Sequence, residues 1–327
     1  MKHYFSVIFP AIFFLTIWGC SKGEKVKFDS TGKINQLLVV MDDRDWKGAL
    51  GDTVRKHFAA DVMVLPQREP LFSINQIPPE VYDKKFFILR NILHVKRGNK
   101  KGIRYIKDAY AQPQLIVEVE GKNLREITDL LNRNAQRIID SFKTNDIKVL
   151  QSRFKAKDLA DDSEIRKTLG IAIDIPKSYK KIVAKDGFFW YREDLPLGSK
   201  NILLYSVPGT DIKKIAARLP QIRDSIGKKY IPGSLPNTWM VTEKSFSPVQ
   251  KEVTVNGLPA IESRGLWEME NDYMGGPYLN YIIPLPHKNH TVIAEGFIYL
   301  PSDEKRNMLT ELEAILKTIR PAEGKDT

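Results

Sequence analysis

The chain has 327 residues, of which 51 are Lys or Arg and 40 are Asp or Glu, so its formal charge at neutral pH is +11. This length is enough to bury one large core or two smaller ones, and a hydrophobic content of 42% excludes wholesale disorder. The single Cys excludes an internal disulfide framework and a zinc site made of clustered cysteines.

The N-terminal residues have the pattern of an export signal. Lys2 and His3 supply a short basic start, and residues 4–18 then carry no charge. A membrane-spanning helix needs about 20 apolar residues, so this run is too short for one but suits the apolar part of a signal peptide. We therefore expect an exported protein, and its net positive charge does not indicate binding to nucleic acid.

The apolar run ends in a segment that resembles a bacterial lipobox, the recognition site of lipoprotein signal peptidase: Leu15-Thr16-Ile17-Trp18-Gly19-Cys20. The single Cys of the chain occupies the lipidated position. The resemblance implies a signal peptide over residues 1–19 and acyl chains such as palmitate on Cys20. The polar, lysine-rich composition that follows predicts a flexible tether over residues 20–33. Ser21 rather than Asp follows Cys20, which implies the outer membrane, and the mixed charges of Lys22-Gly23-Glu24-Lys25, in place of an acidic cluster, favour its periplasmic face.

Residues 34–150 are expected to form an N-terminal α+β domain. An apolar run bounded by Asp42 and Asp43 suits a buried strand, and Asn123 with Glu126 forms a capping pair at a helix start. The predicted elements are a strand at 34–41, a helix at 52–61 capped by Asp52, a loop at 66–79, strands at 86–95 and 114–119, and a helix from 123 to about 143.

The charged composition of residues 151–164 marks the domain boundary, and residues 163–320 are expected to form a C-terminal α+β domain. Asn256-Gly257 is the strongest hairpin signal of the chain, and Pro220 is expected to kink or end a helix. The predicted elements are helices at 163–169, at 211–226 and from Ser302 onward, and strands at 181–183, 188–192, 201–207, 239–242, 249–255, 258–269, 278–284 and 291–299.

Together these elements predict an α+β protein of two domains, each a mainly antiparallel sheet covered by helices. The second domain is similar in its pattern to the photosystem P-protein-like fold, which occurs in many small exported lipoproteins.

Several segments resemble an uncharacterised lipoprotein family of unknown function from Gram-negative bacteria. They are RKHFAA at 55–60, QREPLF at 67–72, DAYAQPQ at 108–114, RDSIGKKYIPG at 223–233, MGGPY at 274–278 and EGFIY at 295–299. The resemblance covers nearly the whole mature chain. It implies a lipidated envelope protein and assigns no active site.

One pair of carboxylates has a spacing that would suit catalysis. Glu268 and Glu270 alternate with Trp267 and Met269 in a predicted strand, so both carboxylates share one face. Two carboxylates on one face can act as acid and base in glycoside hydrolysis. A half-buried strand with its polar face in water explains the same pattern without any chemistry.

Two aromatic runs, at 188–191 and 278–281, could line a groove for a sugar or a peptide. The candidate binding groove therefore consists of Trp190 and Tyr278 together with Glu268 and Glu270. The sequence contains no phosphate-binding loop, no nucleophile elbow and no metal-ligand motif, so we expect no cofactor and no metal.

The leading hypothesis is a lipid-anchored envelope protein with a non-enzymatic binding or structural role. It would contact the membrane through Cys20, and its partner would be another envelope protein or a glycan. The alternative is an envelope hydrolase that acts on a glycan or cell-wall polymer with Glu268 and Glu270.

Overall fold

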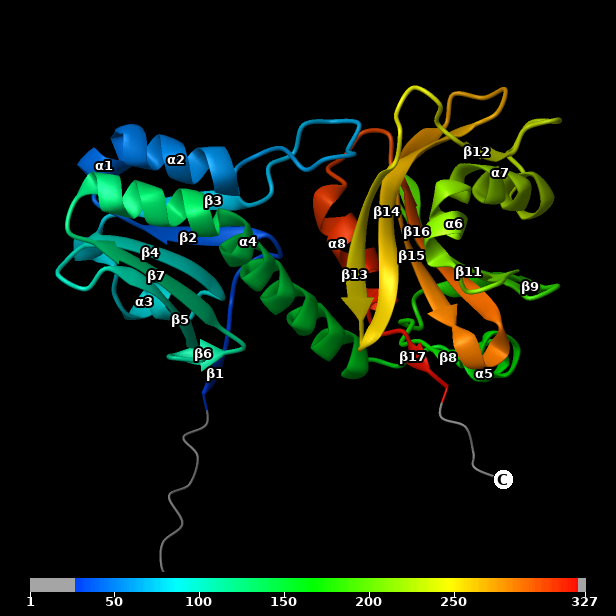
Figure 1. Cartoon of the computed structure of the whole chain (residues 1–327), viewed down its shortest axis with the longest axis horizontal. Helices are drawn as coiled ribbons and strands as arrows, with labels where there is room; N and C mark the ends of the chain where they lie inside the picture. The colour runs from blue at the N-terminus through cyan, green and yellow to red at the C-terminus, as the bar shows by residue number, and fades with distance from the viewer. Residues whose placement is uncertain (1–26, 323–327) are drawn as a thin grey trace, which may run out of the picture.

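The computed structural model describes residues 27–322, which form two large β-sheets with their helices and two small two-stranded sheets (Figure 1). The predicted signal peptide, Cys20 and most of the predicted tether lie outside the described residues. The mixed α+β class predicted from the sequence is confirmed.

The N-terminal sheet has the strand order β3-β2-β4-β7-β5. Its strands are β2 (Gln36–Val40), β3 (Ser73–Ile77), β4 (Asn91–Arg97), β5 (Gly102–Lys107) and β7 (Leu115–Gly121). β3, β2, β4 and β7 pair in parallel, and β5 pairs antiparallel with β7. In this domain the sheet is mainly parallel, which corrects the expectation of an antiparallel one. Continuous apolar runs such as 37–41, buried on both faces, are typical of parallel strands.

Helices lie on both faces of this sheet. They are α1 (Asp43–Lys47), α2 (Ala49–Phe58), α3 (Lys84–Phe87) and the first half of α4 (Leu124–Lys155). Figure 1 shows α1, α2 and α4 above the sheet and α3 below it. The larger core lies between the sheet and helices α2 and α4, and its members include Val39, Phe58, Val117, Leu131 and Phe142.

Three predictions for this domain are corrected. Residues 86–95 are not one strand, because α3 contains Phe86 and Phe87 and β4 starts at Asn91. β3 lies in the segment predicted as a loop, and a short η1 turn (Pro79–Val81) follows it. α2 begins before its predicted cap, so Asp52 lies in the first turn, where its negative charge interacts favourably with the helix dipole.

The strand β1 (Phe28–Asp29), at the start of the described residues, pairs in parallel with β6 (Ala111–Gln112). Both strands lie at the lower edge of the domain in Figure 1, where the described chain begins.

Helix α4 runs through both domains. The side chain of Asn123 accepts a hydrogen bond from the backbone N–H of Glu126, which confirms the predicted cap. The predicted end near residue 143 is wrong, because the helix has 32 residues and ends at Lys155. Its first half contributes to the N-terminal core, and its second half contributes Ile147, Leu150 and Phe154 to the C-terminal core.

The C-terminal sheet has the strand order β12-β14-β15-β16-β11-β10-β9, with β13 beside β14, and its pairs are antiparallel as predicted. Asn256 and Gly257 have positive φ angles of 46° and 83°, which suit the predicted hairpin turn. The strands are β9 (Lys180–Lys185), β10 (Phe188–Leu195), β11 (Gly198–Pro208), β12 (Met240–Thr242), β13 (Val249–Val255), β14 (Leu258–Met269), β15 (Gly275–Leu285) and β16 (His290–Tyr299).

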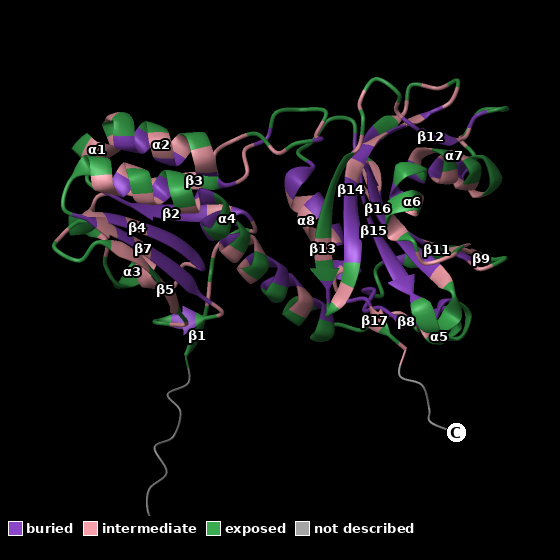
Figure 2. Ribbon diagram, in the orientation of Figure 1, coloured by how far each residue is buried: buried purple, intermediate pink, exposed green. Residues whose placement is uncertain are grey.

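Helices cover both faces of this curved sheet, and Figure 2 shows the buried strands between them. α8, α5 and the end of α4 pack on one face, and α6 and α7 pack on the other. Pro220 lies in the first turn of α7, so the predicted helix at 211–226 is divided in two. The remaining elements are α5 (Ser163–Leu169), α6 (Ile212–Ala217), α7 (Leu219–Tyr230), α8 (Arg306–Leu316), η2 (Pro286–Lys288), β8 (Ile171–Ala172) and β17 (Arg320–Pro321).

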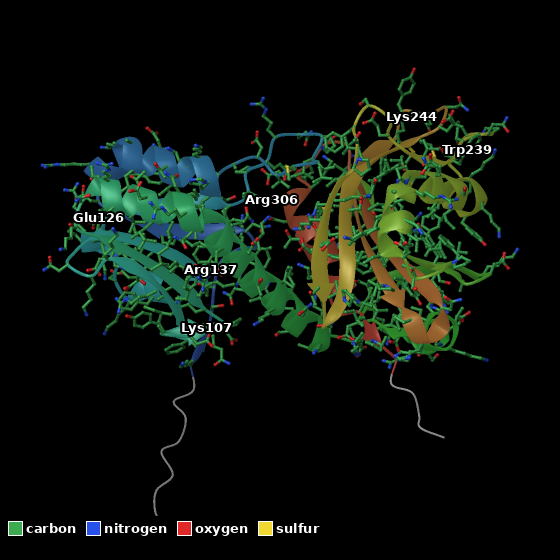
Figure 3. The ribbon with its side chains drawn as sticks, in the orientation of Figure 1. Lys107, Glu126, Arg137, Trp239, Lys244 and Arg306 are labelled. Atoms are coloured by element: carbon green, nitrogen blue, oxygen red, sulfur yellow. The ribbon has the colours of Figure 1, made fainter. Side chains whose placement is uncertain are left out.

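Polar contacts join the two domains at the start of α8. This helix begins at Arg306 and not at the predicted Ser302. The carboxylate of Glu69, from the N-terminal domain, accepts hydrogen bonds from the backbone N–H groups of Lys305 (2.8 Å) and Arg306 (2.9 Å). The Arg306 side chain donates to the backbone oxygen of Pro70 at 2.6 Å, and Figure 3 shows Arg306 between the two domains.

No helix in the described part of the chain has both the length and the apolar composition needed to cross a bilayer.

Candidate functional site

An open groove of about 410 Å³ lies in the C-terminal domain, on the sheet face that packs against α6 and α7. Its walls come from the β10–β11 hairpin, the segment after α7, β12, the end of β14, the turn before β15 and the end of β16. Its volume falls in the range of about 300–1,000 Å³ that is usual for small-molecule sites. Its buried floor includes Trp267, Met269 and Phe297, and its half-buried sides include Trp190, Met274 and Tyr299.

Strand alternation builds this floor. Residues two apart in a strand point to the same face, so Trp267 and Met269 face the groove and Glu268 points away. Trp267 pairs across the sheet with Gly276, and its Nε1 donates to the backbone oxygen of Ile298 at 3.1 Å. A Cβ on Gly276 would stand 2.1 Å from that oxygen, so this close approach requires glycine.

One part of the groove is polar. Nε1 of Trp190 donates to Oδ1 of Asn201 at 2.9 Å, and Nδ2 of Asn201 donates to Oγ of Ser199 at the same distance. Arg192 and Asp194, which also line the groove, form an ion pair at 2.7 Å. These contacts hold the Trp190 ring in one orientation and leave polar groups at the groove wall.

The structure brings together only part of the groove predicted from the sequence. Trp190 lines the groove, whereas Tyr278 is fully buried and is not one of the lining residues. Glu268 and Glu270 are half-buried and are not among the lining residues. The sequence interpretation missed Trp267 and Met269, although the alternation that grouped the two carboxylates also placed these two side chains on one opposite face.

Tyr278 belongs to a buried network that connects α7 to the sheet. The guanidinium of Arg223 binds both carboxylate oxygens of Glu295, at 2.7 and 2.8 Å, and lies 3.7 Å from the centre of the Tyr278 ring. Nδ2 of Asn280 donates to Glu295 at 2.6 Å. Burial raises the pKa of Tyr278 to about 12, so the phenol stays neutral. These charges are buried and satisfy each other, which indicates a structural role.

Within the described residues, no group of three or more His, Cys, Asp and Glu side chains is placed to hold a metal ion. His290, at the start of β16, has its Nε2 3.1 Å from the backbone oxygen of Leu169.

Comparison with known families divides the chain in two. Residues 30–155 match DUF8532 and residues 158–318 match DUF4837, and both are described as domains of unknown function. No curated protein sequence matches the chain.

Two solved structures are distantly similar in shape. The Ran-binding protein Mog1p of Saccharomyces cerevisiae has 12% identity and a TM-score of 0.32, and the match covers 47% of this chain and 90% of that one. A mutant of the protein Mog1 has 14% identity and a TM-score of 0.31, with coverage of 47% and 91%.

Proposed function

We propose that this protein, whose two domains both belong to families of unknown function, is a lipid-anchored binding protein of the cell envelope. The observation that carries the binding role is the groove of the C-terminal domain, with its floor of Trp267, Met269 and Phe297. A concave apolar site with a few convergent polar groups is the usual form of a small-ligand site.

The groove favours an amphipathic ligand. An aromatic or aliphatic group would lie against Trp190 and the buried floor, where each CH₂ removed from water contributes about 0.8 kcal/mol. The polar end of the ligand would lie at Asn201 and the Arg192–Asp194 ion pair, which offer both donors and acceptors. A hydrophobic segment of an envelope protein and a substituted glycan both have this combination.

Hydrolysis by Glu268 and Glu270 receives no support from this geometry. A glycoside hydrolase needs two carboxyl groups on either side of the bond that it breaks. Here the side chains of Trp267 and Met269 point into the groove, and neither carboxylate is part of the groove lining. Binding is therefore the function that we retain.

The proposed anchor is supported by the lipobox-like segment that ends at Cys20. Its test is to replace Cys20→Ser and to fractionate the cells, with a high-salt wash that removes proteins held on the membrane by charge alone. We expect the native chain to stay in the washed membranes and the variant to leave them. Retention of the variant after this wash would contradict the anchor.

Binding in the groove can be tested with a neutral apolar probe, N-phenyl-1-naphthylamine, whose fluorescence rises in an apolar site. Met274→Asp places a charge on the apolar wall, and we expect at least a tenfold weaker binding of the probe, or about 1.4 kcal/mol.

The matched control is Tyr273→Asp, because this neighbouring side chain is fully exposed, at 106%, and does not line the groove. We expect it to bind the probe like the native chain. Equal affinities of the two variants, or no fluorescence increase with the native chain, would contradict the proposed site.

A further inference from the structure

A second concave site of about 620 Å³ lies at the carboxyl end of α4, and it shares no lining residue with the groove. Arg153 lies in the last turn of α4 and Lys157 follows the helix, whereas Lys177 precedes β9 and Lys180 is its first residue. Lys200 of β11 lies at its base and is only 6% exposed. Five cations thus line one pocket, which we call the α4-end pocket.

The acidic side chains of the α4-end pocket already have partners. Nζ of Lys200 lies 2.7 Å from Glu193 and 2.6 Å from Glu311, so these two carboxylates are bound to a buried ammonium. The third acid, Asp158, forms an ion pair with Lys177 at 3.3 Å.

This leaves three cations at the mouth of the pocket. Arg153, Lys157 and Lys180 are exposed and form no ion pair within the described residues. The Lys180 ammonium has one neutral contact, a hydrogen bond of 3.4 Å to the backbone oxygen of Lys177. The mouth of the α4-end pocket is therefore positive, and the pocket is concave enough to admit an anionic group.

The position of the pocket relates it to the membrane. In Figure 1 the carboxyl end of α4 lies on the same side of the molecule as β1 and β17, and α1 and α2 lie on the opposite side. Cys20 precedes Phe28 by eight residues, a length of chain that reaches roughly 26–29 Å at most. An acyl group on Cys20 would hold this side of the protein close to the bilayer.

We propose that the α4-end pocket binds the phosphate groups of anionic lipids in the membrane that holds the anchor, an inference that rests on the proposed lipidation of Cys20. Arg153 can bind two phosphate oxygens with its planar guanidinium, and Lys157 and Lys180 add point charges. The negative potential of an anionic bilayer attracts such residues over a distance of about one Debye length.

The test uses the mature chain without its acyl groups, residues 20–327 with Cys20→Ser, so that binding does not depend on the anchor. Vesicles of phosphatidylcholine, with and without phosphatidylglycerol, are sedimented with the protein. We expect binding that needs phosphatidylglycerol and weakens as salt is added. The triple variant Arg153→Gln, Lys157→Gln, Lys180→Gln should bind about 100-fold more weakly, because each basic residue near an anionic surface contributes roughly fivefold.

The matched control removes three exposed cations from the opposite side, Arg44→Gln, Lys47→Gln and Lys56→Gln, and changes the net charge equally. It should bind within about twofold of the native chain. Circular dichroism and thermal unfolding would check that each variant is folded.

Three outcomes would overturn the proposal. They are binding to vesicles without phosphatidylglycerol, equal weakening in both triple variants, and calorimetric binding of inorganic phosphate in the absence of vesicle binding. The last outcome would assign the pocket to a soluble phosphate. None of them bears on the anchor, which the salt-washed membranes of the Cys20→Ser cells test separately.

Discussion

Glu313 of α8 lies between two cations on the face of the C-terminal sheet. Its carboxylate is 2.8 Å from Nη2 of Arg264 and 2.6 Å from Nζ of Lys317. Burial alone would raise the pKa of Glu313, but Arg264 and Lys317 hold this pKa far below its ordinary value. Arg264 also pairs with Glu262 at 2.7 Å, and it holds the pKa of Glu262 low against the effect of burial.

We therefore expect the free energy of unfolding to fall when the solution is acidified below about pH 4.5, the ordinary pKa of a Glu side chain. A carboxylate with a lower pKa in the folded state stabilises folding above this pH, and the contribution is lost as the pH falls towards the folded value. Glu313→Gln removes up to one proton from the uptake that accompanies unfolding. The free energy of unfolding of this variant should therefore fall less steeply with pH, by up to about 1.4 kcal/mol per pH unit. Urea unfolding between pH 5 and pH 3 measures both slopes, and equal slopes would count against this role.

At the scale of elements, helix α8 takes its N-terminal cap from the other domain. The side chain of Lys305, the residue at its cap position, does not cap the helix, and the carboxylate of Glu69 accepts hydrogen bonds from the first free N–H groups instead. Glu69 is only 3% exposed and lies in the segment QREPLF. A negative charge at this end of a helix also interacts favourably with the helix dipole.

Glu69→Ala should lower the free energy of unfolding by about 1–2 kcal/mol, because two buried N–H groups lose their acceptor. Chemical unfolding in urea measures this change. The control is Glu304→Ala, an exposed acid at the same end of the same helix, which should change stability by less than about 0.5 kcal/mol. A similar loss in both variants would assign the effect to net charge and not to the cap.

At the scale of the whole molecule, α4 makes the two domains depend on each other. The same helix buries Leu131 and Phe142 in the N-terminal core and Leu150 and Phe154 in the C-terminal core. Disorder in either core removes packing from one half of this helix. We expect the native chain to unfold in one transition, with tryptophan fluorescence and far-UV circular dichroism changing together.

Thr144 is exposed on α4 between the residues that enter the two cores. Thr144→Pro removes a helical hydrogen bond and causes a steric clash, at a cost of about 3 kcal/mol or more. We expect the variant to unfold in two separate transitions in urea, while Thr144→Ala keeps the single transition. A single transition in the proline variant would show that the contacts around Glu69 are enough to couple the domains.

The sequence was sufficient to predict most of the C-terminal strands, because alternation and a strong hairpin signal at Asn256-Gly257 are local properties. Prediction from the sequence was less reliable in the N-terminal domain, where Phe86 and Phe87 were predicted to lie in a strand but belong to the short helix α3. Short apolar runs do not distinguish a strand from a buried helical turn. The end of α4 was also missed, because the polar residues after 143 include both exposed cations such as Lys148 and Arg153 and the buried Asp146, whose ion pair with Arg90 is a tertiary contact.

The sequence by itself determined the mixed α+β fold class, and for the site it identified the aromatic side chain of Trp190. Only the tertiary structure decided that Trp267, and not Tyr278 or Glu270, lies in the groove. The physical reason is that the alternation of side chains along a strand shows which residues share a face, but it does not show which helices pack on that face. That choice depends on the packing of α6, α7 and α8 on a curved sheet, and it is made by contacts between residues far apart in the chain.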